Sequence, residues 1–541
     1  MPESALAAEQ VDQLAARLRA LTESNKQLES ERDEYKRVYV ALLEAYRKLE
    51  AGLVGQKRER FIGSDEQLTL AELLKLVVPV APESTPTTEV PAHERAKPTG
   101  RKPLPEKLPR VVVEVVPPEV QRGGLDAFHR IGEDVSEVVE HRPASFVVVR
   151  TVRPKYVAKE KLEALPVGES TPVMQSAALE LPIPRAIAGP SLLADTIVKR
   201  WEEHLPLYRL ERMYGREGLP LARSTICGWH AAVAELTSPL VAAMFDDARM
   251  TAPYLCADAT GVLVQAPDKC RRAHFFVLVA PGKHVLFMYT KKHDGKAVDA
   301  LLGDYQGFLV VDAHSVYEHL FEDGVIEVAC WAHLRRYAFK SLETDGVRAR
   351  YALSLIQALF KLEREYGSEP PAEKLRLRKL KAKPIVDAFF VWCDEESLKV
   401  LDETPISKAI QYARNQREAL HQFLNNGNLP IHNNISENAL RREALGRKNW
   451  LFLGSDDGGE VNATLVSLLA SCKLHGIEPH GYLRDLLCLL PSWPVQRVLE
   501  LAPAFWRKTL EAPGIREQLE ANVYRQAALG VLKPSETAAS N

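Results

Sequence analysis

The stretch Tyr254–Thr290, YLCADATGVLVQAPDKCRRAHFFVLVAPGKHVLFMYT, decides the fold of the central part of the chain. Its apolar runs, rich in β-branched and aromatic residues, are separated by turn residues, which is typical of strands linked by hairpins. Downstream, GFLVVD (Gly307–Asp312) and IEVACWA (Ile326–Ala332) indicate further strands, each followed by a helical pattern. Hairpins followed by strand–helix alternation predict a mixed sheet with flanking helices.

Aspartates close two of the predicted strands: Asp258 ends YLCAD, and Asp312 ends GFLVVD. A carboxylate at the carboxyl end of a buried strand is costly within a core but natural in a site at the rim of a sheet. A single aspartate at a strand end is more often a turn or cap residue. The pair is more informative, because both strands are expected in the same small sheet.

A third carboxylate, Glu437, lies in PIHNNISENALRR (Pro430–Arg442), one turn into a predicted helix that we expect to pack on this sheet. Asn433 or Asn434 could cap that helix. Arg441 lies one turn beyond Glu437, where it would hold the glutamate or bind a phosphate. Three converging carboxylates predict a site for Mg²⁺ (or Mn²⁺), where two ions about 3.5–4 Å apart clamp the oxygens of a phosphodiester.

The segment CWAHLRR places Cys330 and His333 at a zinc-like spacing. A zinc site needs three or four ligands, and no second Cys/His pair of matching spacing is visible in the sequence. We therefore expect a packing or hydrogen-bonding role for these two residues near the site, and we do not expect zinc. Arg335 and Arg336 beside them are candidate DNA contacts.

The composition is that of an ordinary globular protein, with 46% hydrophobic and 26% charged residues among 541. This length predicts about three or four domains. The net charge of −2 excludes a whole-chain electrostatic argument for nucleic-acid binding, so any such argument needs local basic patches. Scattered cysteines, no signal pattern and no apolar run of about 20 residues predict a cytoplasmic protein without membrane spans.

Residues 11–53 carry a heptad pattern of hydrophobic residues, which predicts a coiled coil that pairs the chain with itself. Asn25 falls at an a position, where a buried amide favours two strands. The alternative is one long helix packed on its own protein. The proline-rich residues that follow predict an extended linker, whose segment TGRKPLP is either solvated or inserted in a minor groove.

A helix-turn-helix is predicted within PLYRLERMYGREGLPLARSTICGWH (Pro206–His230), with a glycine turn at Gly215–Gly218 and a second helix capped by Ser224. Arg223 and Thr225 would stand at the start of that helix, where base or phosphate contacts are made. The alternative is a pair of packed helices with no role in DNA binding.

Two long segments closely resemble the insertion-sequence-66 family of DDE transposases. They are GFLVVDAHSVYEHLFEDGVIEVACWAHLRRYAF (Gly307–Phe339) and NNISENALRREALGRKNWLFLGSDDGG (Asn433–Gly459). The resemblance implies a ribonuclease-H-like core in which Asp258, Asp312 and Glu437 match the catalytic and metal-binding triad of the family. The interval before Glu437 is long for that fold, which fits a helical insertion at about 346–425.

The chain also departs from the family pattern. Family members generally carry a cysteine zinc-binding module in the region that matches 111–170, whereas this chain has no cysteine before Cys227. Ala259 follows Asp258 where the family often has Glu, and His432 stands where it often has Asp. The triad is retained, so the resemblance implies an active enzyme that cuts at the ends of its element and joins the freed 3′-hydroxyl to target DNA.

The resemblance implies several partners: the terminal inverted repeats of the element, target DNA, a second copy of the chain and companion proteins of the element. The expected DNA contacts are Arg223, Thr225, Arg335, Arg336, Arg441, Arg442, Arg447 and Lys448. Two other classes of function stay open. One is a ribonuclease-H-like nuclease that cuts without strand transfer, and the other is a non-catalytic DNA-binding protein that works through its helix-turn-helix.

The expected fold class is a multidomain α+β/α chain. The expected parts are a coiled-coil dimerisation region (1–76), a Pro-rich linker (77–110), a β-rich module without its zinc-binding cysteines (111–185), a helix-turn-helix-like segment (186–245), the first part of a ribonuclease-H-like mixed α/β core (246–345), an all-helical insertion (346–428), the last part of the core with Glu437 (429–478) and a helical C-terminal element (479–541).

Overall fold

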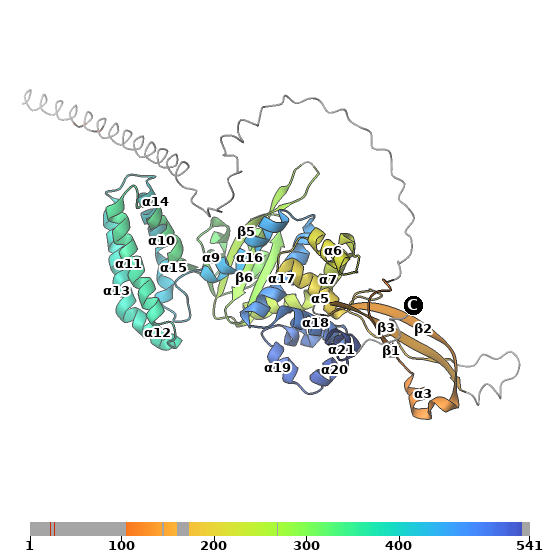
Figure 1. Cartoon of the computed structure of the whole chain (residues 1–541). Coiled ribbons are helices and arrows are strands. Elements are labelled where there is room, and N and C mark those ends of the chain that lie inside the picture. Colours follow the sequence, from red (N-terminus) through yellow and green to blue (C-terminus); the bar gives the residue numbers. More distant parts are fainter. Residues whose placement is uncertain are drawn as a thin grey trace, which may run out of the picture.

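The structure of the chain is a computed structural model. It describes residues 104–142, 145–158, 173–267 and 269–532, together with Thr22 and Lys26. The predicted coiled coil, apart from those two residues, and the predicted linker up to residue 103 lie outside the described residues. Figure 1 shows two sheets, with the helical insertion at one end of the molecule and a β-rich module at the other.

Five strands form the sheet predicted from the central stretch: β5 (Leu255–Val264), β6 (Arg271–Ala280), β7 (His284–Thr290), β8 (Phe308–Val311) and β9 (Ile326–Ala329). Their order in the sheet is β7-β6-β5-β8-β9. The first three are antiparallel neighbours, whereas β8 and β9 run parallel to β5. The prediction of a mixed sheet is therefore confirmed.

One expectation for this sheet is wrong. YLCAD and GVLVQA form a single strand, β5, so Asp258 lies inside a strand and does not close it. Strand β6 pairs with β5 on both sides of this point, with Asp258 opposite Val277 and Thr260 opposite Phe275. This continuous ladder keeps the backbone extended through the short polar segment between the two apolar runs. Asp312 directly follows β8, as predicted.

Helix α17 (Asp456–Leu474) covers the edge strand β7 of this sheet. The hydroxyls of Ser467 and Ser471 accept hydrogen bonds from the backbone N–H groups of Phe287 (2.7 Å) and Val285 (3.1 Å). An edge strand presents unpaired backbone donors, and these serines satisfy two of them. The side chains of a helix thereby cover this edge of the sheet.

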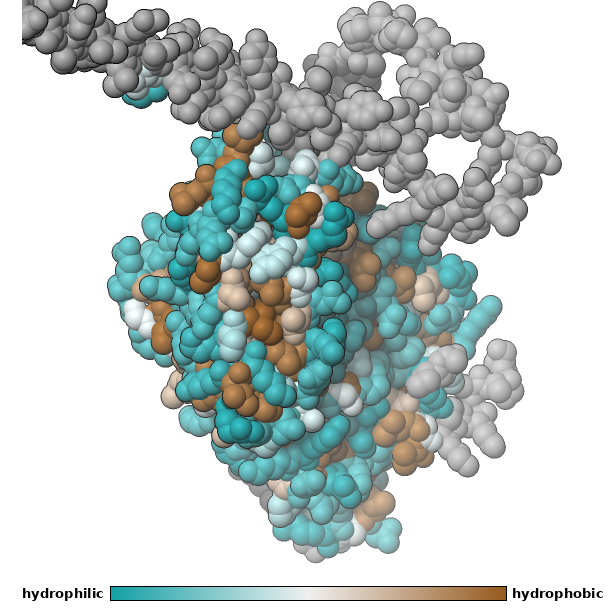
Figure 2. Space-filling view, turned by 90° about the vertical axis from the view of Figure 1, so that its left-hand side faces the viewer, coloured by the Kyte–Doolittle hydropathy of each residue, from teal (hydrophilic) through white to brown (hydrophobic). Residues whose placement is uncertain are grey.

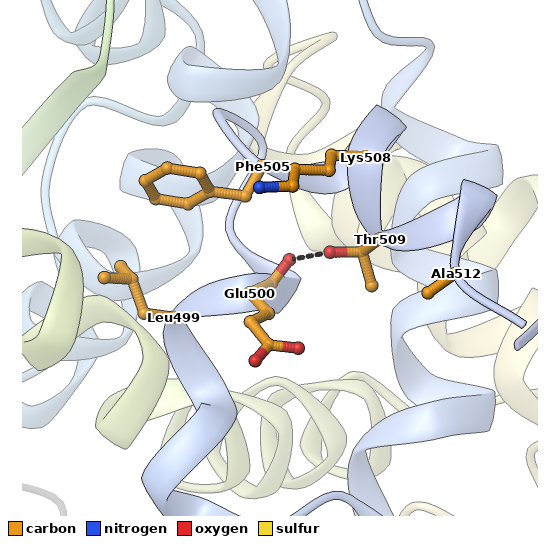
Figure 3. A pocket seen from close by; sticks show the side chains of 6 residues that line it. All are labelled: Leu499, Glu500, Phe505, Lys508, Thr509 and Ala512. Atoms are coloured by element: carbon orange, nitrogen blue, oxygen red, sulfur yellow. Dashed lines mark hydrogen bonds between the residues drawn. The ribbon is translucent and has the colours of Figure 1, made fainter.

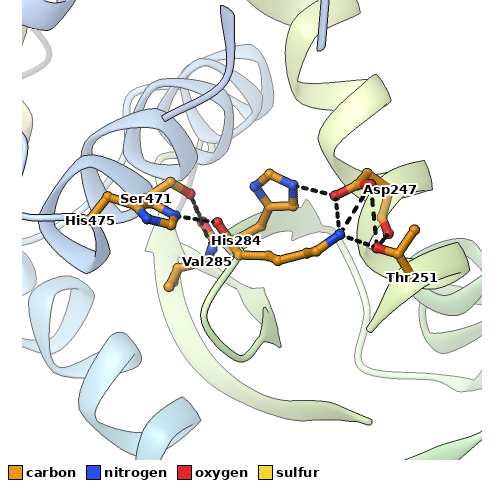
Figure 4. Close-up of polar contacts among 7 residues, drawn as sticks. Asp247, Thr251, His284, Val285, Ser471 and His475 are labelled. Atoms are coloured by element: carbon orange, nitrogen blue, oxygen red, sulfur yellow. Dashed lines mark hydrogen bonds and ion pairs between the residues drawn. The ribbon is translucent and has the colours of Figure 1, made fainter. Parts of the chain in front are cut away.

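Helix α7 (Arg223–Thr251) is joined to the same strand by a polar contact. The buried ring of His284 lies 2.9 Å from a carboxylate oxygen of Asp247, which also pairs with the ammonium of Lys283. On the other side, the ring of His475 lies 2.8 Å from the Lys283 carbonyl (Figure 4). These contacts attach α7 and α17 to the start of β7, so the helices and the sheet form one body.

The remaining helices next to the sheet follow the predicted strand–helix alternation. They are α8 (Gly295–Leu302), α9 (Glu318–Glu322), α10 (Trp331–Lys340) and α16 (Asn434–Trp450). Helix α16 packs on β5 and β6. Short 3-10 helices occur at Leu125–Ala127, Ser315–Tyr317, Gln422–Leu424, Leu490–Ser492 and Val495–Leu501.

The β-rich module has its own sheet, as predicted. Its elements are β1 (Arg110–Glu114), α3 (Pro118–Gly123), β2 (Phe128–Arg142), β3 (Ser145–Ala158) and β4 (Met174–Gln175). Strand β3 lies between β1 and β2 and also pairs with β4. The long antiparallel ribbon of β2 and β3 projects from the molecule in Figure 1.

Two helices, α5 (Pro190–Trp201) and α6 (Leu207–Arg216), lie between this module and α7. The predicted pair of helices with a glycine turn is present as α6 and α7, with Gly218 in the left-handed region (φ 88°). The expected cap is wrong. Ala222 occupies the N-cap position of α7, and no side chain bonds the first N–H groups, because Ser224 already lies inside the first turn.

The segment expected as an all-helical insertion consists of helices and the turns between them, while its place within a ribonuclease-H-like core stays a prediction. It contains α11 (Gly346–Glu365), α12 (Pro371–Leu377), a π-helical turn (Arg378–Ala382), α13 (Lys383–Ser397), α14 (Pro405–Asn415) and α15 (Arg417–His421). Seen from this end of the molecule, hydrophilic side chains frame a strip of hydrophobic ones (Figure 2). The exposed large hydrophobic residues of the insertion are Val347, Tyr351, Leu380, Val391 and Leu398.

The C-terminal element consists of α18 (Pro479–Leu489), α19 (Trp506–Glu511), α20 (Ile515–Ala521) and α21 (Val523–Ala528). It contains a pocket of about 350 Å³ lined by Leu499, Glu500, Phe505, Lys508, Thr509 and Ala512 (Figure 3). None of these residues belongs to the sheet. In the part of the chain that the structure describes, every helix is too short or too polar to cross a membrane.

Candidate functional site

The two predicted aspartates lie side by side on neighbouring parallel strands. Strand β5 pairs with β8 in a register that sets Leu255 opposite Leu309 and Cys256 opposite Val310. Continuing this register by two residues sets Asp258 opposite Asp312. Residues opposite each other in a sheet project to the same face, so both carboxylates are presented together.

The backbone turns sharply just after Asp312. Ala313 has a φ of 60°, in the left-handed region that a residue with a Cβ seldom occupies. Such conformations are held in place by the surrounding structure and are concentrated at functional sites. The turn ends β8 directly beside the middle of β5, so Asp312 stays next to Asp258 at the end of its strand.

Glu437 lies in the first turn of α16, as predicted, and the start of this helix is tied to the sheet by Asn433. The Asn433 side-chain amide donates to the carbonyl of Ala257 (2.8 Å), the residue before Asp258. Its backbone N–H donates to the thiol of Cys330 (3.2 Å), directly after β9. The helix that carries Glu437 is therefore anchored to both sides of the aspartate pair.

The expected capping by asparagine is only half right. Asn433 occupies the N-cap position, but its side chain makes no bond to an N–H group of the helix. Instead, its carbonyl oxygen accepts from the hydroxyl of Ser436 (2.5 Å) while its amide reaches β5. The hydrogen-bonding role predicted for Cys330 is confirmed, since its buried thiol accepts from Asn433.

The electrostatics of the three acids show that they interact. Burial, together with the charges of Asp312 and Glu437, raises the pKa of Asp258 to about 7, against the opposing effects of the Ala259 N–H and the charge of Arg336. Like charges close together disfavour ionisation. The site therefore carries more negative charge than its own cations compensate.

The side chains nearest Glu437 come from α10 and not from its own helix, and only Arg336 is a cation, because burial lowers the pKa of His333. His333 Nε2 lies 3.5 Å from Oε1 of Glu437, and the Arg336 guanidinium lies 3.7 Å from Oε2. Arg441, expected to hold the glutamate or to bind a phosphate, is exposed and is not among the described residues that pair with Glu437, so only the second alternative stays open. One turn along a helix brings residues onto one face, but α10 packs beside the start of α16 and reaches the carboxylate first.

The expected DNA contacts fall into two groups. Arg442 pairs with Glu202 and its side chain is mostly buried, while Arg447 donates to the carbonyl of Gly261, so both tie α16 to its neighbours. Both therefore contribute to packing, while their role as DNA contacts stays a prediction. The exposed residues of the expected set are Arg223, Arg335, Arg336, Arg441 and Lys448, with Thr225 half-buried. Arg223 also pairs with Glu211 (3.0 Å).

Several residues at the site were missed by sequence reasoning. The Tyr317 hydroxyl is buried and has no hydrogen-bond partner in the part of the chain that the structure describes, and burial together with the charges of Asp312 and Asp258 raises its pKa. The ring centroids of His293 and His314 lie 4.6 Å apart. Burial lowers the pKa of His293, and the charge of Asp312 opposes this shift. His314 and Tyr317 follow Asp312 closely in the sequence, which was the available signal.

The donor set fits a hard divalent cation. Three carboxylates supply the oxygen ligands that Mg²⁺ and Mn²⁺ take in proteins. Oε1 of Glu437 is buried and lacks a hydrogen-bond partner among the described residues. A buried oxygen atom without a partner and a surplus of negative charge are both satisfied by a cation. Asp258, Asp312 and Glu437 therefore supply the ligand types for such an ion, although among the described residues only His141, Asp195 and His480 have ligand atoms that all lie within 4.8 Å of one another.

Comparison with known proteins gives matches along most of the chain. Residues 185–461 match the model of the Transposase IS66 family, and residues 467–504 match the IS66 C-terminal element. Residues 41–113 match a model described as Transposase C of IS166 homeodomain. Residues 121–157 match the zinc-finger binding domain of transposase IS66.

Relatives of similar length occur in Sinorhizobium fredii. Uncharacterized protein y4hP is 29% identical over 510 residues, which cover 87% of this chain and 90% of that protein. Uncharacterized protein y4qI is 32% identical over 429 residues, covering 75% of this chain and 77% of that protein. Uncharacterized protein y4jD is 27% identical over 426 residues, covering 75% and 81%.

The residues that match the zinc-finger model do not fit a zinc finger. The sequence has no cysteine before Cys227, so residues 121–157 offer only His129 and His141 as nitrogen or sulfur ligands. A structural zinc site needs four such ligands close together. The match with the transposase model covers more than half of the chain, and the chain belongs to the IS66 family of transposases.

Proposed function

We propose that this chain is the DNA transposase of a bacterial insertion sequence and that Asp258, Asp312 and Glu437 are its catalytic carboxylates. The observation that carries the proposal is the shared register of Asp258 and Asp312, with the helix of Glu437 tied to Ala257 beside them. In this proposal the three residues hold two Mg²⁺ or Mn²⁺ ions.

The strand order supports a ribonuclease-H-like core. Three antiparallel strands are followed by two parallel ones, and the first and fourth strands of the chain order, β5 and β8, are neighbours at the centre of the sheet. At this junction, Asp258 lies in the middle of β5, and Asp312 follows the end of β8. A helix that returns after the long insertion adds the third carboxylate.

Bound divalent ions supply Lewis acidity and stabilise both the attacking and the leaving oxygen of an in-line displacement at phosphorus. In the first reaction, water attacks a phosphodiester at an end of the element, and the 3′-oxygen leaves as a hydroxyl. In the second, that 3′-hydroxyl attacks a target phosphodiester, and one bond is exchanged for another. Arg336, beside Glu437, would orient that carboxylate and lower the negative charge that a phosphate meets.

The proposed DNA surface consists of the exposed basic side chains near the carboxylates. Arg335 and Arg336 on α10 and Arg441 and Lys448 on α16 are exposed. Phosphate contacts of this kind position DNA without reading its sequence. Helices α6 and α7 would recognise the terminal inverted repeats, with Arg223 and Thr225 in the first turn of α7.

The proposal includes pairing of two chains through the heptads at 11–53, so that two element ends are held together. Companion proteins of the element are possible further partners. We place the protein in the cytoplasm, at the nucleoid where its DNA substrate lies.

The test is Asp312→Asn in purified full-length protein, with duplex DNA that carries the element ends and with Mg²⁺ present. Removing one of three carboxylates at the reaction centre is expected to lower the rate of cleavage and strand transfer by at least about 10³-fold, several kcal/mol of transition-state stabilisation. Asp323→Asn is the matched control, since Asp323 is exposed in the loop before β9.

The outcomes separate the three classes of function. Cleavage without a joined product would favour a ribonuclease-H-like nuclease. Transposition that proceeds at the wild-type frequency with Asp312→Asn would leave only a DNA-binding role and would refute the enzyme. Binding of the end duplex by the variant shows that its fold is intact.

A further inference from the structure

A second group of metal-ligating side chains lies where the β-rich module, α5 and α18 meet. His141 stands near the end of β2, Asp195 in the middle of α5 and His480 in the first turn of α18. One ligand atom from each lies within 4.8 Å of the other two. His141 and Asp195 are buried and His480 is half-buried.

Hydrogen bonding does not account for this arrangement. Nδ1 of His141 lies 3.4 Å from Oδ1 of Asp195, yet this buried nitrogen has no hydrogen-bond partner among the described residues. Ligands at 2.0–2.1 Å from a tetrahedral zinc ion stand about 3.3–3.4 Å apart. The two atoms are therefore already at the separation that a shared ion imposes.

The surrounding bonds orient the Asp195 carboxylate as the outer shell of a metal site does. The other carboxylate oxygen of Asp195 accepts from the hydroxyl of Tyr214 (2.6 Å) and the ammonium of Lys199 (2.8 Å), which leaves Oδ1 for the cluster. The hydroxyl of Ser191 donates to the carbonyl of His141 (2.6 Å) and lies 3.5 Å from Nε2 of His480. Such partners fix ligand orientation and raise affinity.

Burial favours the neutral form of both imidazoles. Burial lowers the pKa of His141 to about 4 and also lowers that of His480. A neutral ring offers the nitrogen lone pair that a metal requires, without a proton to displace. Two nitrogens and one carboxylate oxygen suit Zn²⁺ or a similar borderline ion better than Mg²⁺, which prefers an all-oxygen site.

We propose that Nδ1 of His141, Oδ1 of Asp195 and one ring nitrogen of His480 bind one Zn²⁺ ion, with water as the fourth ligand. The ion would cross-link three segments that are distant in the sequence and so join the β-rich module to the C-terminal element. The site is separate from the carboxylates of the central sheet. It also differs from a zinc finger, since only His141 lies within residues 121–157.

The experiment uses the full-length protein, stripped with a chelator and dialysed against Co²⁺ or Zn²⁺ with excess Mg²⁺ present to occupy the carboxylate site. Metal content is measured per chain, and Co²⁺ is followed by its visible absorption. The wild-type protein is expected to retain about one ion, with the absorption of a nitrogen- and oxygen-ligated tetrahedral site.

Two variants and a matched control test the assignment. His141→Gln and Asp195→Asn are each expected to weaken Co²⁺ binding by at least about 100-fold, since losing a ligand costs more than losing an outer-shell partner. His129→Gln is the control, because His129 is exposed on the same strand β2. Asp195→Asn keeps the shape of the side chain, so it decides the question if His141→Gln lowers the helical and strand content seen by circular dichroism.

Three results would overturn the proposal. The wild-type chain could fail to retain an ion, the two variants could retain as much as His129→Gln, or Asp312→Asn could abolish Co²⁺ retention. The last result would assign the ion to the central carboxylates. Failure of the metal site would leave the proposed transposase activity untouched, because that activity is measured through DNA products.

Discussion

Buried charge is compensated by neighbouring side chains in the helical insertion but only partly compensated in the central sheet. In the insertion, the guanidinium of Arg378, only 1% exposed, meets both carboxylate oxygens of Glu363 at 2.6 and 2.7 Å. It also donates to the carbonyls of Phe423, Asn426 and Leu429. Every donor has an acceptor, so this charge is compensated within the chain.

In the central sheet, Arg336 lies 3.7 Å and the His333 ring 3.5 Å from Glu437, no ion pair joins Asp258 or Asp312 to another described residue, and a buried oxygen of Glu437 has no hydrogen-bond partner among the described residues. Buried charge that the chain neutralises by itself holds helices together. A surplus of one sign left at the rim of a sheet indicates a ligand of the opposite sign. The comparison therefore separates structural from functional charge.

The compensated charge gives the largest expected effect on stability. Arg378→Met leaves Glu363 and three carbonyls without their donor, so we expect the free energy of unfolding to fall by about 3–5 kcal/mol. Denaturant unfolding followed by circular dichroism measures it. Arg376→Met is the control, because the Arg376–Glu373 pair is exposed and exposed pairs contribute little to stability. Equal losses in the two variants would contradict the structural role of Arg378.

The uncompensated charge predicts a dependence on pH with a defined sign. The pKa of Asp258 rises from 3.8 to about 7 on folding, so the folded state holds more protons than the unfolded state in that window. Stability of the metal-free protein should therefore decrease as pH rises from about 4 to about 7. Mg²⁺ replaces this proton, so its affinity should increase by up to about tenfold per pH unit below 7 and level off above.

Calorimetric titration with Mg²⁺ on both sides of pH 7 checks this expectation. Glu327→Gln is the control, because the pKa of Glu327 is also raised to about 7 by burial and by the charges of Glu318 and Asp312. It should alter the pH dependence of stability but keep that of Mg²⁺ affinity. An affinity for Mg²⁺ that is flat across pH 7 in the wild-type protein would count against the compact carboxylate site.

Neighbouring arginines of α16 give the smallest expected effect. Arg441→Ala removes an exposed charge and should weaken DNA binding by about tenfold or less while lowering the slope of affinity against salt by about 1. Arg442→Ala should leave that slope unchanged and reduce stability, because Arg442 pairs with Glu202. Fluorescence anisotropy over a range of salt concentrations measures both. The same change of slope for both variants would show that Arg442 also contacts DNA.

Much of the fold could be predicted from local patterns. The hairpins of the central sheet, the helical insertion and the two helices around Gly218 follow from alternation, helical periodicity and turn residues. Asp258, Asp312 and Glu437 were singled out by their places in these elements and by the family resemblance. Their catalytic role stays a prediction. The break expected after Asp258 failed because pairing with β6 overrides the local weakness of the strand.

The contacts around the site could not be predicted in the same way. Helical spacing suggested Arg441 as the partner of Glu437, but packing of α10 supplies Arg336 and His333 instead. In the sequence, Arg442 and Arg447 have no visible partner. In the structure, Arg442 pairs with Glu202 and Arg447 donates to the carbonyl of Gly261. A side chain reports its own chemistry in the sequence, while its partner depends on which distant segment packs beside it.

The sequence by itself determined the local elements, the family and the three carboxylates as candidates, because strand alternation, helix periodicity and motif identity are properties of neighbouring residues. Only the tertiary structure decided which charges are compensated and which are left over. It also brought together His141, Asp195 and His480, which no spacing rule connects. Burial against a distant segment removes water and selects partners, and that selection is not encoded in any local pattern.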